Sequence, residues 1–392
     1  MTDQPVGCSV AIFFYAGDFA DVLRRHAEGA QQIYATHDEV ARLILGLRVE
    51  KVNVTIYSYV TDVAKEETPM EGVRVVSLGA TGANRGVLKT AVESVEADTI
   101  IAHFAYPELL IAAIKSGKRV FAGLANSYNE RGFKQFLRRK RIAHILNNKR
   151  IRMITNHCVP ATRHLADIGV ARDKLVPWDV PHRFQPAAYS PKDLARKEWY
   201  KVAYAGSIAE LKGVGDLIRA IAQLKSGGLN LRASFAGLGD IETMQALADS
   251  LGIGDHVDFR GIVGNELVFN MFRDADIVVV PSRTAYPEGF PLTMFEAIAS
   301  RSPIVCTDHP MFQPILTDQV NCTVFKSGDV DGFADAIRRI LVDPALYRQL
   351  SDHAPKTWEA LRGPADWRTL ITKWVTEGEH SPWLADYRLK PS

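Results

Sequence analysis

The sequence predicts an α/β protein made of two doubly wound domains, and three observations lead to this prediction. The chain has 392 residues, which is too many for one ordinary hydrophobic core and suits two domains. Short apolar runs alternate with segments of helical periodicity in both halves of the chain. Residues 180–191 are proline-rich and lack periodicity, so they are expected to link the two halves.

The first half contains six apolar runs that are expected to form strands. They are residues 10–15, 52–59, 73–78, 99–104, 119–124 and 151–155. Between the first two runs, residues 38–45 have apolar side chains at helical spacing. Near-continuous apolar strands that alternate with helices favour a parallel sheet covered on both faces. Residues 1–190 are therefore expected to form one Rossmann-like domain.

The second half repeats this pattern. Its expected strands are residues 201–206, 231–237, 256–261, 276–281 and 303–307, and its clearest helices are 214–224 and 333–341. Residues 199–364 are therefore expected to form a second Rossmann-like domain. Ligands of open α/β sheets bind outside the carboxyl ends of the strands, so two such domains facing each other across a cleft could hold two substrates.

The C-terminal residues 365–392 are expected to fold back onto the first domain. Residues 365–377 are predicted to be a helix with Trp367, Leu370, Ile371 and Trp374 on one face. Burial of such large aromatic side chains would contribute several kcal/mol. The alternative is that this segment only caps the second domain.

The composition is that of an ordinary soluble globular protein. Hydrophobic residues make up 47% and charged residues 23%, and the net charge of +2 indicates no polyanionic partner such as nucleic acid. The four cysteines are scattered without a C-x-x-C pair, which argues against a zinc site or a disulfide framework. The N-terminus shows no signal-peptide pattern and no long apolar run occurs, so a cytoplasmic location is expected.

The most informative segment is V-P-S-R-T-A-Y-P-E-G-F-P-L-T-M-F-E-A-I-A, residues 280–299. A strand is expected to end at residues 281–282, and Pro291 suits the first turn of the helix that follows a short loop. The free N–H groups at this helix start can bind an anion. Glu288 lies in the loop and Glu296 on the helix. Both elements suit a nucleotide sugar, whose diphosphate needs N–H groups and whose hydroxyls need carboxylates.

This segment resembles the signature of the retaining family-four glycosyltransferases, which have the GT-B architecture of two Rossmann-like domains. The matching residues are Glu288, Gly289, Phe290, Pro291, Glu296 and Ala297. The resemblance implies that Glu288 contacts the donor sugar and Glu296 the ribose. It also implies that Gly289, Phe290 and Leu292 offer backbone N–H groups to the donor. The alternative is a structural one, in which Glu288 caps the helix and Glu296 is solvated.

The resemblance extends upstream to Y-A-G-S-I-A-E-L-K-G-V, residues 204–214. Gly206 matches the family, and Lys212 would bind the donor diphosphate and help the leaving group depart. Ser207 stands where the family usually has an arginine that binds the diphosphate. Gly237, in F-A-G-L-G-D, matches a turn near the nucleobase. The alternatives are an exposed lysine for Lys212 and an ordinary tight turn for Gly237.

The first half matches the family only in its expected topology. Gly17, after the first strand, is the best candidate for a close approach to the diphosphate, although a plain turn would also explain it. Relatives often place a histidine after the fifth strand, where this chain has Asn126. His103, at the end of the fourth strand, is the alternative candidate for that catalytic position. A buried structural histidine is an equally good explanation of His103.

Residues 131–152 are strongly basic and carry interleaved apolar side chains. A basic amphipathic helix of this kind can lie on an anionic membrane. The alternative is a solvated helix whose apolar stripe, including Phe133, Phe136 and Leu137, faces the core. Nucleic acid is not expected as a partner, because no recognition module accompanies the basic residues.

These features together predict a retaining, metal-independent hexosyltransferase. Its donor is expected to be a UDP- or GDP-sugar, and it needs no cofactor. The acceptor hydroxyl could belong to a small molecule, a lipid-linked glycan or a polysaccharide intermediate. The alternatives are a catalytically degenerate protein that binds nucleotide sugars and a sugar-nucleotide epimerase on the same fold.

Overall fold

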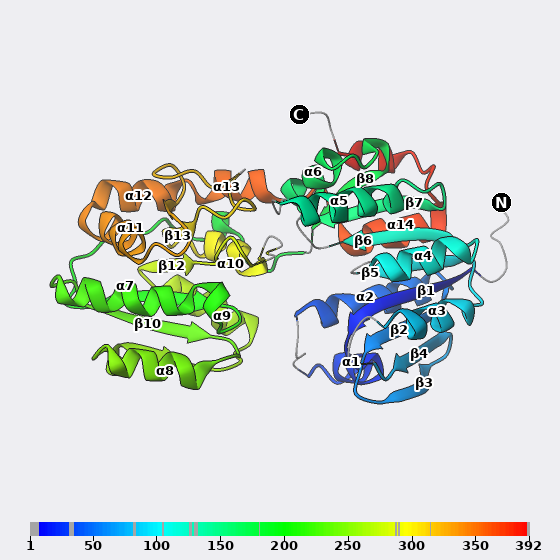
Figure 1. The fold of residues 1–392 in the computed structure, drawn as a ribbon, viewed down its shortest axis with the longest axis horizontal. Coiled ribbons are helices and arrows are strands. Elements are labelled where there is room, and N and C mark those ends of the chain that lie inside the picture. The colour runs from blue at the N-terminus through cyan, green and yellow to red at the C-terminus, as the bar shows by residue number, and fades with distance from the viewer. Residues whose placement is uncertain are drawn as a thin grey trace. The chain divides into compact units, whose positions relative to one another are not determined.

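In the computed structural model the chain divides into two units (Figure 1). The first comprises Met1–Pro181 with Gly363–Ser392, and the second comprises His182–Arg362. The structure describes residues 8–30, 35–80, 84–103, 106–124, 128, 132–179, 181–286, 288, 291–313 and 315–389.

The first unit is built around one sheet whose strands run in the order β15-β8-β7-β6-β5-β1-β2-β4-β3. Its strands are β1 (Ser9–Ala16), β2 (Asn53–Val60), β3 (Ala64–Met70), β4 (Val73–Leu78), β5 (Thr99–His103), β6 (Arg119–Leu124), β7 (Ile151–His157), β8 (Leu175–Asp179) and β15 (Ala365–Asp366). Its helices are α1 (Phe19–Ala27), α2 (Ala35–Val49), α3 (Arg85–Glu93), α4 (Pro107–Lys115), α5 (Phe133–Leu146), α6 (Val159–Asp167), η1 (Arg172–Lys174), α14 (Trp367–Glu377) and α15 (Trp383–Tyr387).

The sheet of the first unit is covered on both faces, as its apolar strands predict. Successive side chains of a strand point to opposite faces. Accordingly, Ile12 and Phe14 of β1 lie in one core, with α1, α2 and α14, while Phe13 lies in the other, with α3 to α6. All three side chains are essentially buried. A strand buried on both sides needs the uninterrupted apolar sequence from which it was predicted.

The C-terminal segment is part of the first unit. Trp367, Leu370, Ile371 and Trp374 of α14 are all buried, in the same core as α2. The helix begins two residues later than the sequence pattern suggests, because Ala365 and Asp366 form β15, which pairs in parallel with β8.

Three strands of this sheet were not predicted from the sequence. One of them, β3, pairs antiparallel to β4, so the sheet is not wholly parallel. Its sequence, A-K-E-E-T-P-M, is mostly exposed and lacks the apolar character of a buried strand. The other two, β8 and β15, are short.

The second unit contains a six-stranded sheet in the order β11-β10-β9-β12-β13-β14, in which the strands pair in parallel. Its strands are β9 (Tyr200–Ala205), β10 (Leu231–Ala236), β11 (Val257–Phe259), β12 (Ile277–Val280), β13 (Ile304–Thr307) and β14 (Thr323–Phe325). Its helices are η2 (Pro186–Ala188), η3 (Glu210–Lys212), α7 (Val214–Ser226), α8 (Ile241–Ser250), η4 (Gly254–His256), α9 (Asn265–Asp274), α10 (Leu292–Ser300), α11 (Val330–Val342), α12 (Pro344–Asp352) and α13 (Ala354–Leu361).

The proline-rich residues after Pro181 differ from the expected linker. They belong to the second unit, where the ring of Phe184 stacks on Phe269 with 3.9 Å between centroids. The ring of His182 stacks on Phe295 at 4.1 Å. Aromatic side chains therefore attach this stretch to α9 and α10, and the division falls near residue 182 rather than 190.

Each sheet contains a point at which the strand order reverses. In the first unit it lies between β1 and β5, and in the second between β9 and β12. The loops that leave two such strands diverge to opposite faces of the sheet, which opens a crevice at their carboxyl ends. The cleft expected between the two units stays a prediction. Among the described residues, no helix has the length and apolarity needed to cross a membrane.

Candidate functional site

The predicted site residues of the second unit lie at its reversal point. Gly206 and Ser207 directly follow β9, and Lys212 ends the short helix η3 just beyond them. Glu288 belongs to the loop that follows β12, the neighbouring strand. The fold therefore brings together two segments that are about 80 residues apart in the sequence.

Lys212 and Glu288 form a tight ion pair. The Lys212 Nζ donates to Glu288 Oε1 at 2.7 Å and to Oε2 at 2.8 Å. The Ser282 hydroxyl donates to Glu288 Oε1 at 3.0 Å. The side chains of Lys212 and Glu288 are only 13% and 6% exposed. A paired charge with little water around it interacts more strongly than a surface pair. The structure thus excludes the exposed lysine that the sequence left as an alternative.

The loop that carries Glu288 is fastened at Tyr286. The ammonium group of Lys212 lies over the Tyr286 ring, 4.2 Å from its centroid. The Tyr286 carbonyl accepts hydrogen bonds from the Glu288 N–H at 2.7 Å and from His309 Nε2 at 3.1 Å. The Met311 N–H donates to His309 Nδ1, so Nε2 carries the proton. Burial lowers the pKa of His309, which favours this neutral form.

A second ion network, which the sequence did not reveal, fixes the start of the same loop. Arg283 donates to Asp216 at 2.7 and 2.8 Å and to Glu210 at 2.7 Å. Asp216 lies in the first turn of α7 and is 2% exposed. Arg283 was visible inside the motif, but its partners lie 67 and 73 residues away, so only the fold pairs them. We attribute a positioning role to Arg283, because its guanidinium group is engaged by these carboxylates.

Glycines allow the loops at this reversal point to pack backbone against backbone. A Cβ on Gly213 would lie 2.1 Å from the Pro281 carbonyl oxygen, and one on Gly237 would lie 1.8 Å from the Gly206 carbonyl oxygen. Both residues also have positive φ, 75° and 143°. Gly206 and Gly237 therefore bring the ends of β9 and β10 into direct contact, which a residue with a side chain would prevent.

The helix α10 begins beside this loop and carries Glu296. Pro291 is its N-cap, and the N–H groups of Leu292 and Thr293 donate to no protein group in the described part of the chain. Such a helix start can bind an anion. Glu296 is partly buried, and burial raises the pKa of its carboxyl to about 7. Gly289 and Phe290, predicted to contact the donor, lie outside the described residues.

Ser207 contributes no cation, and its carbonyl accepts a hydrogen bond from the Tyr204 hydroxyl at 2.7 Å. Burial raises the pKa of Tyr204, so this hydroxyl stays protonated and acts as a donor. The turn after β9 is therefore held through the Ser207 backbone, and its side chain is free to differ from the arginine of the family.

In the first unit, Gly17 lies in the turn between β1 and α1, with φ of 129°. A Cβ at this position would lie 2.8 Å from Nε2 of His37, so the turn requires glycine. The next residue, Asp18, caps α1 by accepting hydrogen bonds from the N–H groups of Ala20 and Asp21. Gly17 therefore holds a left-handed turn just before the helix, and its approach to a diphosphate stays a prediction.

His103 is enclosed at the end of β5 and only 4% exposed. Its ring stacks on Phe14, 4.5 Å away, and meets the edge of Trp367 at 5.4 Å. Burial lowers the pKa of His103 to about 3. This environment supports the buried structural histidine that the sequence left as an alternative, and the catalytic assignment of His103 stays an untested prediction. Asn126, the other candidate, lies outside the described residues.

Three tyrosines lie near one another at the carboxyl ends of β1, β2 and β5, in a cluster that no sequence pattern indicated. The ring of Tyr15 lies 5.8 Å from that of Tyr59 and 6.3 Å from that of Tyr106. Tyr15 is 40% and Tyr106 is 36% exposed, whereas Tyr59 is buried. Exposed rings with hydroxyl groups suit a ligand that offers both apolar faces and hydrogen-bonding groups.

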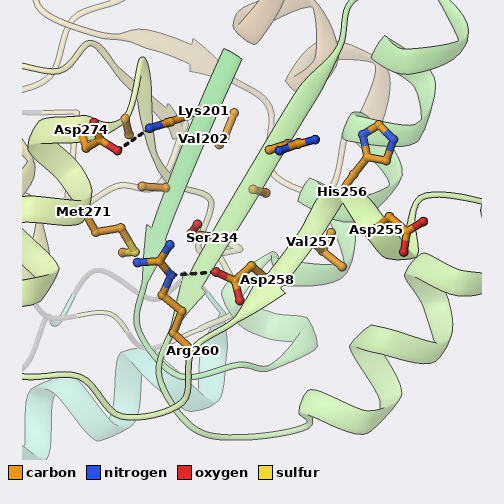
Figure 2. A pocket seen from close by; sticks show the side chains of 14 residues that line it. Lys201, Val202, Ser234, Asp255, His256, Val257, Asp258, Arg260, Met271 and Asp274 are labelled. Atoms are coloured by element: carbon orange, nitrogen blue, oxygen red, sulfur yellow. Dashed lines mark hydrogen bonds and ion pairs between the residues drawn. The ribbon is translucent and has the colours of Figure 1, made fainter. Parts of the chain in front are cut away.

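A hollow of about 430 Å³ lies elsewhere on the second unit (Figure 2). It faces the amino-terminal halves of β9 and β10 and is lined by charged groups that pair with one another. Lys201 pairs with Asp274 at 2.6 Å, and Arg260 pairs with Asp258 at 2.8 Å. Neither Lys212, Glu288 nor Glu296 lines it. The hollow therefore does not coincide with the candidate site.

Within the described residues, no group of three or more His, Cys, Asp or Glu side chains is arranged to hold a metal ion.

Comparison with protein families identifies the second unit. Residues 187–357 match the family described as glycosyl transferases group 1. The chain is also 34% identical over 157 residues to the D-inositol 3-phosphate glycosyltransferase of Mycolicibacterium smegmatis. That match covers 39% of this chain and 36% of the relative, so it spans little more than a third of the relative's length.

Solved structures resemble the chain over nearly its whole length. Sucrose-phosphate synthase from Thermosynechococcus elongatus aligns with a TM-score of 0.65 and 18% identity, covering 96% of this chain and all of that one. Anabaena HepE, solved in complex with UDP and glucose, aligns with a TM-score of 0.61 and 15% identity, covering 95% and 99%. At these identities the likeness shows the fold, which is the GT-B architecture expected from the sequence.

Proposed function

Because the chain belongs to the group 1, family-four glycosyl transferases, we propose that it moves a hexosyl group from a nucleotide diphosphate sugar to an acceptor hydroxyl. The observation that carries this proposal is the pair of Lys212 and Glu288, held 2.7 Å apart at the reversal point of the second sheet. Ligands of open α/β sheets bind at such a point. The pair supplies a cation for a diphosphate and a carboxylate for sugar hydroxyls.

In the proposed reaction, Lys212 and the free N–H groups at the start of α10 stabilise the diphosphate as it leaves. Preorganised donors of this kind lower the barrier because they act where negative charge develops. Glu288 accepts hydrogen bonds from the donor sugar, and Glu296 from the ribose. Donor binding therefore requires Lys212 to divide its three N–H donors between Glu288 and the diphosphate.

We propose that the reaction retains the anomeric configuration. Glu288 is engaged by Lys212 and by the Ser282 hydroxyl, so we do not assign it as the nucleophile of a double displacement. Attack from the face on which the diphosphate departs would let a phosphate oxygen accept the acceptor proton. Such a reaction needs no enzyme base, which agrees with the enclosed position of His103.

The acceptor is assigned to the first unit. Tyr15 and Tyr106 present partly exposed rings at the reversal point of its sheet, close to the Gly17 turn. Rings with hydroxyl groups would bind a sugar-containing or lipid-linked acceptor through both stacking and hydrogen bonds. We place this reaction in the cytoplasm, where nucleotide sugars would be available as donors.

The decisive experiment measures nucleotide release from a panel of UDP-, GDP- and dTDP-sugars, with and without a mixture of candidate acceptors. Transfer with one donor, and an α-configured product from an α-configured donor by nuclear magnetic resonance, is the expected result. Tight nucleotide binding without turnover would instead support a degenerate binding protein. Interconversion of sugar nucleotides without transfer would support an epimerase.

The proposed reaction is metal-independent, because Lys212 and the α10 N–H groups supply the positive charge for the diphosphate. Activity should therefore survive EDTA. Loss of activity in EDTA, restored by manganese, would contradict this part of the proposal.

A further inference from the structure

The helix α5 changes character halfway along its length. None of the residues from Phe133 to Arg141 is buried, whereas Ile142, Ala143, Ile145 and Leu146 are all buried in the core. The sequence allowed all the apolar residues of α5 to form one core-facing stripe. The structure excludes that alternative for the first two turns, which carry their apolar side chains outside the core.

Three large apolar side chains are exposed on these turns. Phe133 is 76%, Phe136 is 46% and Leu137 is 52% exposed. At about 100° per residue, positions three and four apart share one side of a helix. Phe133, Phe136 and Leu137 therefore form a single apolar strip, and it lies opposite the buried Ile142 and Leu146. Scattered exposed apolar residues are ordinary, but a contiguous strip of this size indicates a binding surface.

The same strip is bordered by cations. Lys134, Arg139, Lys140 and Arg141 lie beside it, whereas Arg138 lies on the side of the helix that carries Ile142. The helix contains no Asp or Glu, and Lys140 lies over the Phe136 ring at 5.8 Å from its centroid. Glu108 of α4 is the acidic group that approaches from a neighbouring element, 3.6 Å from Arg141. We call residues 133–141 the α5 face.

The basic region is narrower than residues 131–152, which the sequence suggested. Arg150 donates to the Gly117 carbonyl at 2.7 Å, and Arg152 lies 3.8 Å from Glu379. These two arginines therefore stabilise the first unit internally. The α5 face retains the combination of apolar and basic side chains.

We infer that the α5 face docks the protein on the surface of an anionic lipid bilayer. Charge complementarity selects this partner, because acidic headgroups would meet four cations beside the strip, with no acidic residue on the helix to repel them. The apolar strip would enter the boundary between headgroups and acyl chains, while the long basic side chains reach back to the phosphates. A protein partner fits less well, because interface cores are depleted in lysine. Nucleic acid would leave the three apolar side chains without a function.

The test is co-sedimentation of the full chain with vesicles. Vesicles of phosphatidylcholine alone are compared with vesicles that also contain phosphatidylglycerol, at low and high salt. We expect binding only to the anionic vesicles, weakened by salt because the charges are screened.

Two variants separate the contribution of the apolar side chains to vesicle binding from that of the basic side chains. Phe133→Ser/Phe136→Ser/Leu137→Ser should weaken binding by at least about tenfold, because the apolar strip is lost. Lys134→Gln/Lys140→Gln/Arg141→Gln should weaken it by about a hundredfold, because each basic residue near an anionic surface contributes about fivefold. All six side chains lie outside the core, so thermal unfolding followed by circular dichroism should be unchanged.

The control replaces three exposed apolar residues that lie outside the α5 face. Val49→Ser/Val63→Ser/Leu267→Ser removes side chains that are 81%, 65% and 61% exposed and that belong to other parts of the fold. This variant should bind like the original chain. Equal binding of the chain to both kinds of vesicle, or no vesicle binding at all, would overturn the inference. Unchanged binding of the α5 variants would do so as well. None of these measurements depends on transferase activity.

Discussion

The two units share a sheet topology and differ in what occupies its reversal point. In the second unit the strand ends carry the ion pair of Lys212 and Glu288, with hydrogen bonds that hold both side chains in place. In the first unit the end of β5 carries His103, packed between Phe14 and Trp367. The same fold thus provides a polar site in one unit and an aromatic core in the other. The topology determines where a ligand can bind, and the side chains at that position determine whether a reaction can be catalysed there.

The two units also differ in how closely they match known proteins. The family match covers residues 187–357, which lie in the second unit, whereas the likeness of solved structures covers 96% of the chain at 18% identity. The proposed donor, with its diphosphate, would constrain the residues of the second unit that bind it. The first unit resembles solved structures in fold at low sequence identity.

The largest expected effect is a loss of stability that is confined to the first unit, and it is expected at Trp374. This side chain is fully buried, with its ring 5.2 Å from Phe121 and beneath Arg119. Trp374→Ala should destabilise the first unit by about 3–5 kcal/mol, because it leaves a large cavity. Urea unfolding monitors stability, and calorimetry with UDP and GDP monitors the second unit, whose nucleotide affinity should not change. The partly buried Trp383→Ala is the control, and an equal loss there would show that the tail as a whole, rather than the core position, matters.

Glu288→Gln should abolish most activity while leaving the first unit intact. Losing one group that stabilises the transition state costs roughly 10²–10³ in kcat. The comparison is with Glu359→Gln, an exposed carboxylate of α13. Steady-state kinetics with the donor identified by the panel is the measurement. Normal turnover by Glu288→Gln would remove this residue from the mechanism.

Lys212→Met should destabilise the second unit by about 2–4 kcal/mol, because Glu288 is then left buried without its cation. Adding Glu288→Gln should recover part of this loss, which a double-mutant cycle measures. The exposed pair of Arg348 and Asp193 provides the contrast, since surface pairs contribute about 1 kcal/mol or less. Equal coupling energies for the two pairs would contradict the importance given to burial.

Glu296→Gln should weaken nucleotide binding by about 1.5–3 kcal/mol, because a hydrogen bond to a charged acceptor is lost. It should also stabilise the second unit at alkaline pH. Burial raises the pKa of Glu296 to about 7, so its contribution to stability is present at acid pH and is lost as the pH rises through 7. Above that range the variant should be more stable by about 1–3 kcal/mol. Calorimetry and urea unfolding at several pH values test both parts, and a variant that binds nucleotide normally would place Glu296 outside the site.

At neutral pH the smallest effect is expected at His103, whose titration affects stability only at acid pH. Burial lowers its pKa to about 3, so the folded state keeps this imidazole neutral. Its contribution to stability is present above the unfolded pKa of about 6.5 and is lost as the pH falls toward 3. The slope is at most about 1.4 kcal/mol per pH unit for one proton. His103→Phe should flatten the pH dependence of first-unit stability between these limits, while an unaltered slope would mean that other groups cause it.

Most strands of the first sheet that are buried on both faces were predicted from the sequence, with β8 as the exception. The strand β1 was recognised because Ile12, Phe13 and Phe14 are all apolar, whereas β3 was missed because its exposed charges give no such signal. The tail helix was predicted from the spacing of its tryptophans. The two residues of β15 carry no pattern of their own, since they form a strand only because β8 lies beside them.

The candidate site, too, could be predicted from the sequence only in part, because local motifs do not show which distant residues pair. Lys212 and Glu288 were recognised through local motifs, but their direct pairing across 76 residues emerges only in the fold. The anchoring of the loop by Arg283 and His309 likewise depends on partners that are distant in the sequence, 67 and 73 residues from Arg283 and 23 residues from His309. Conversely, His103 looked suitable from its place at a strand end. The tertiary packing of Phe14 and Trp367 against it was invisible in the sequence.

The short strand β15 has a consequence for how the protein behaves in concentrated solution. A sheet edge with free N–H and C=O groups can pair with the edge of another molecule, which leads to aggregation. One edge of the first sheet is β3, where Lys65, Glu66 and Glu67 with Pro69 discourage such pairing. The other would be β8, a buried and largely apolar strand, if β15 did not cover it. The C-terminal segment thus covers part of an apolar sheet edge. Its removal is expected to cause aggregation as well as loss of stability.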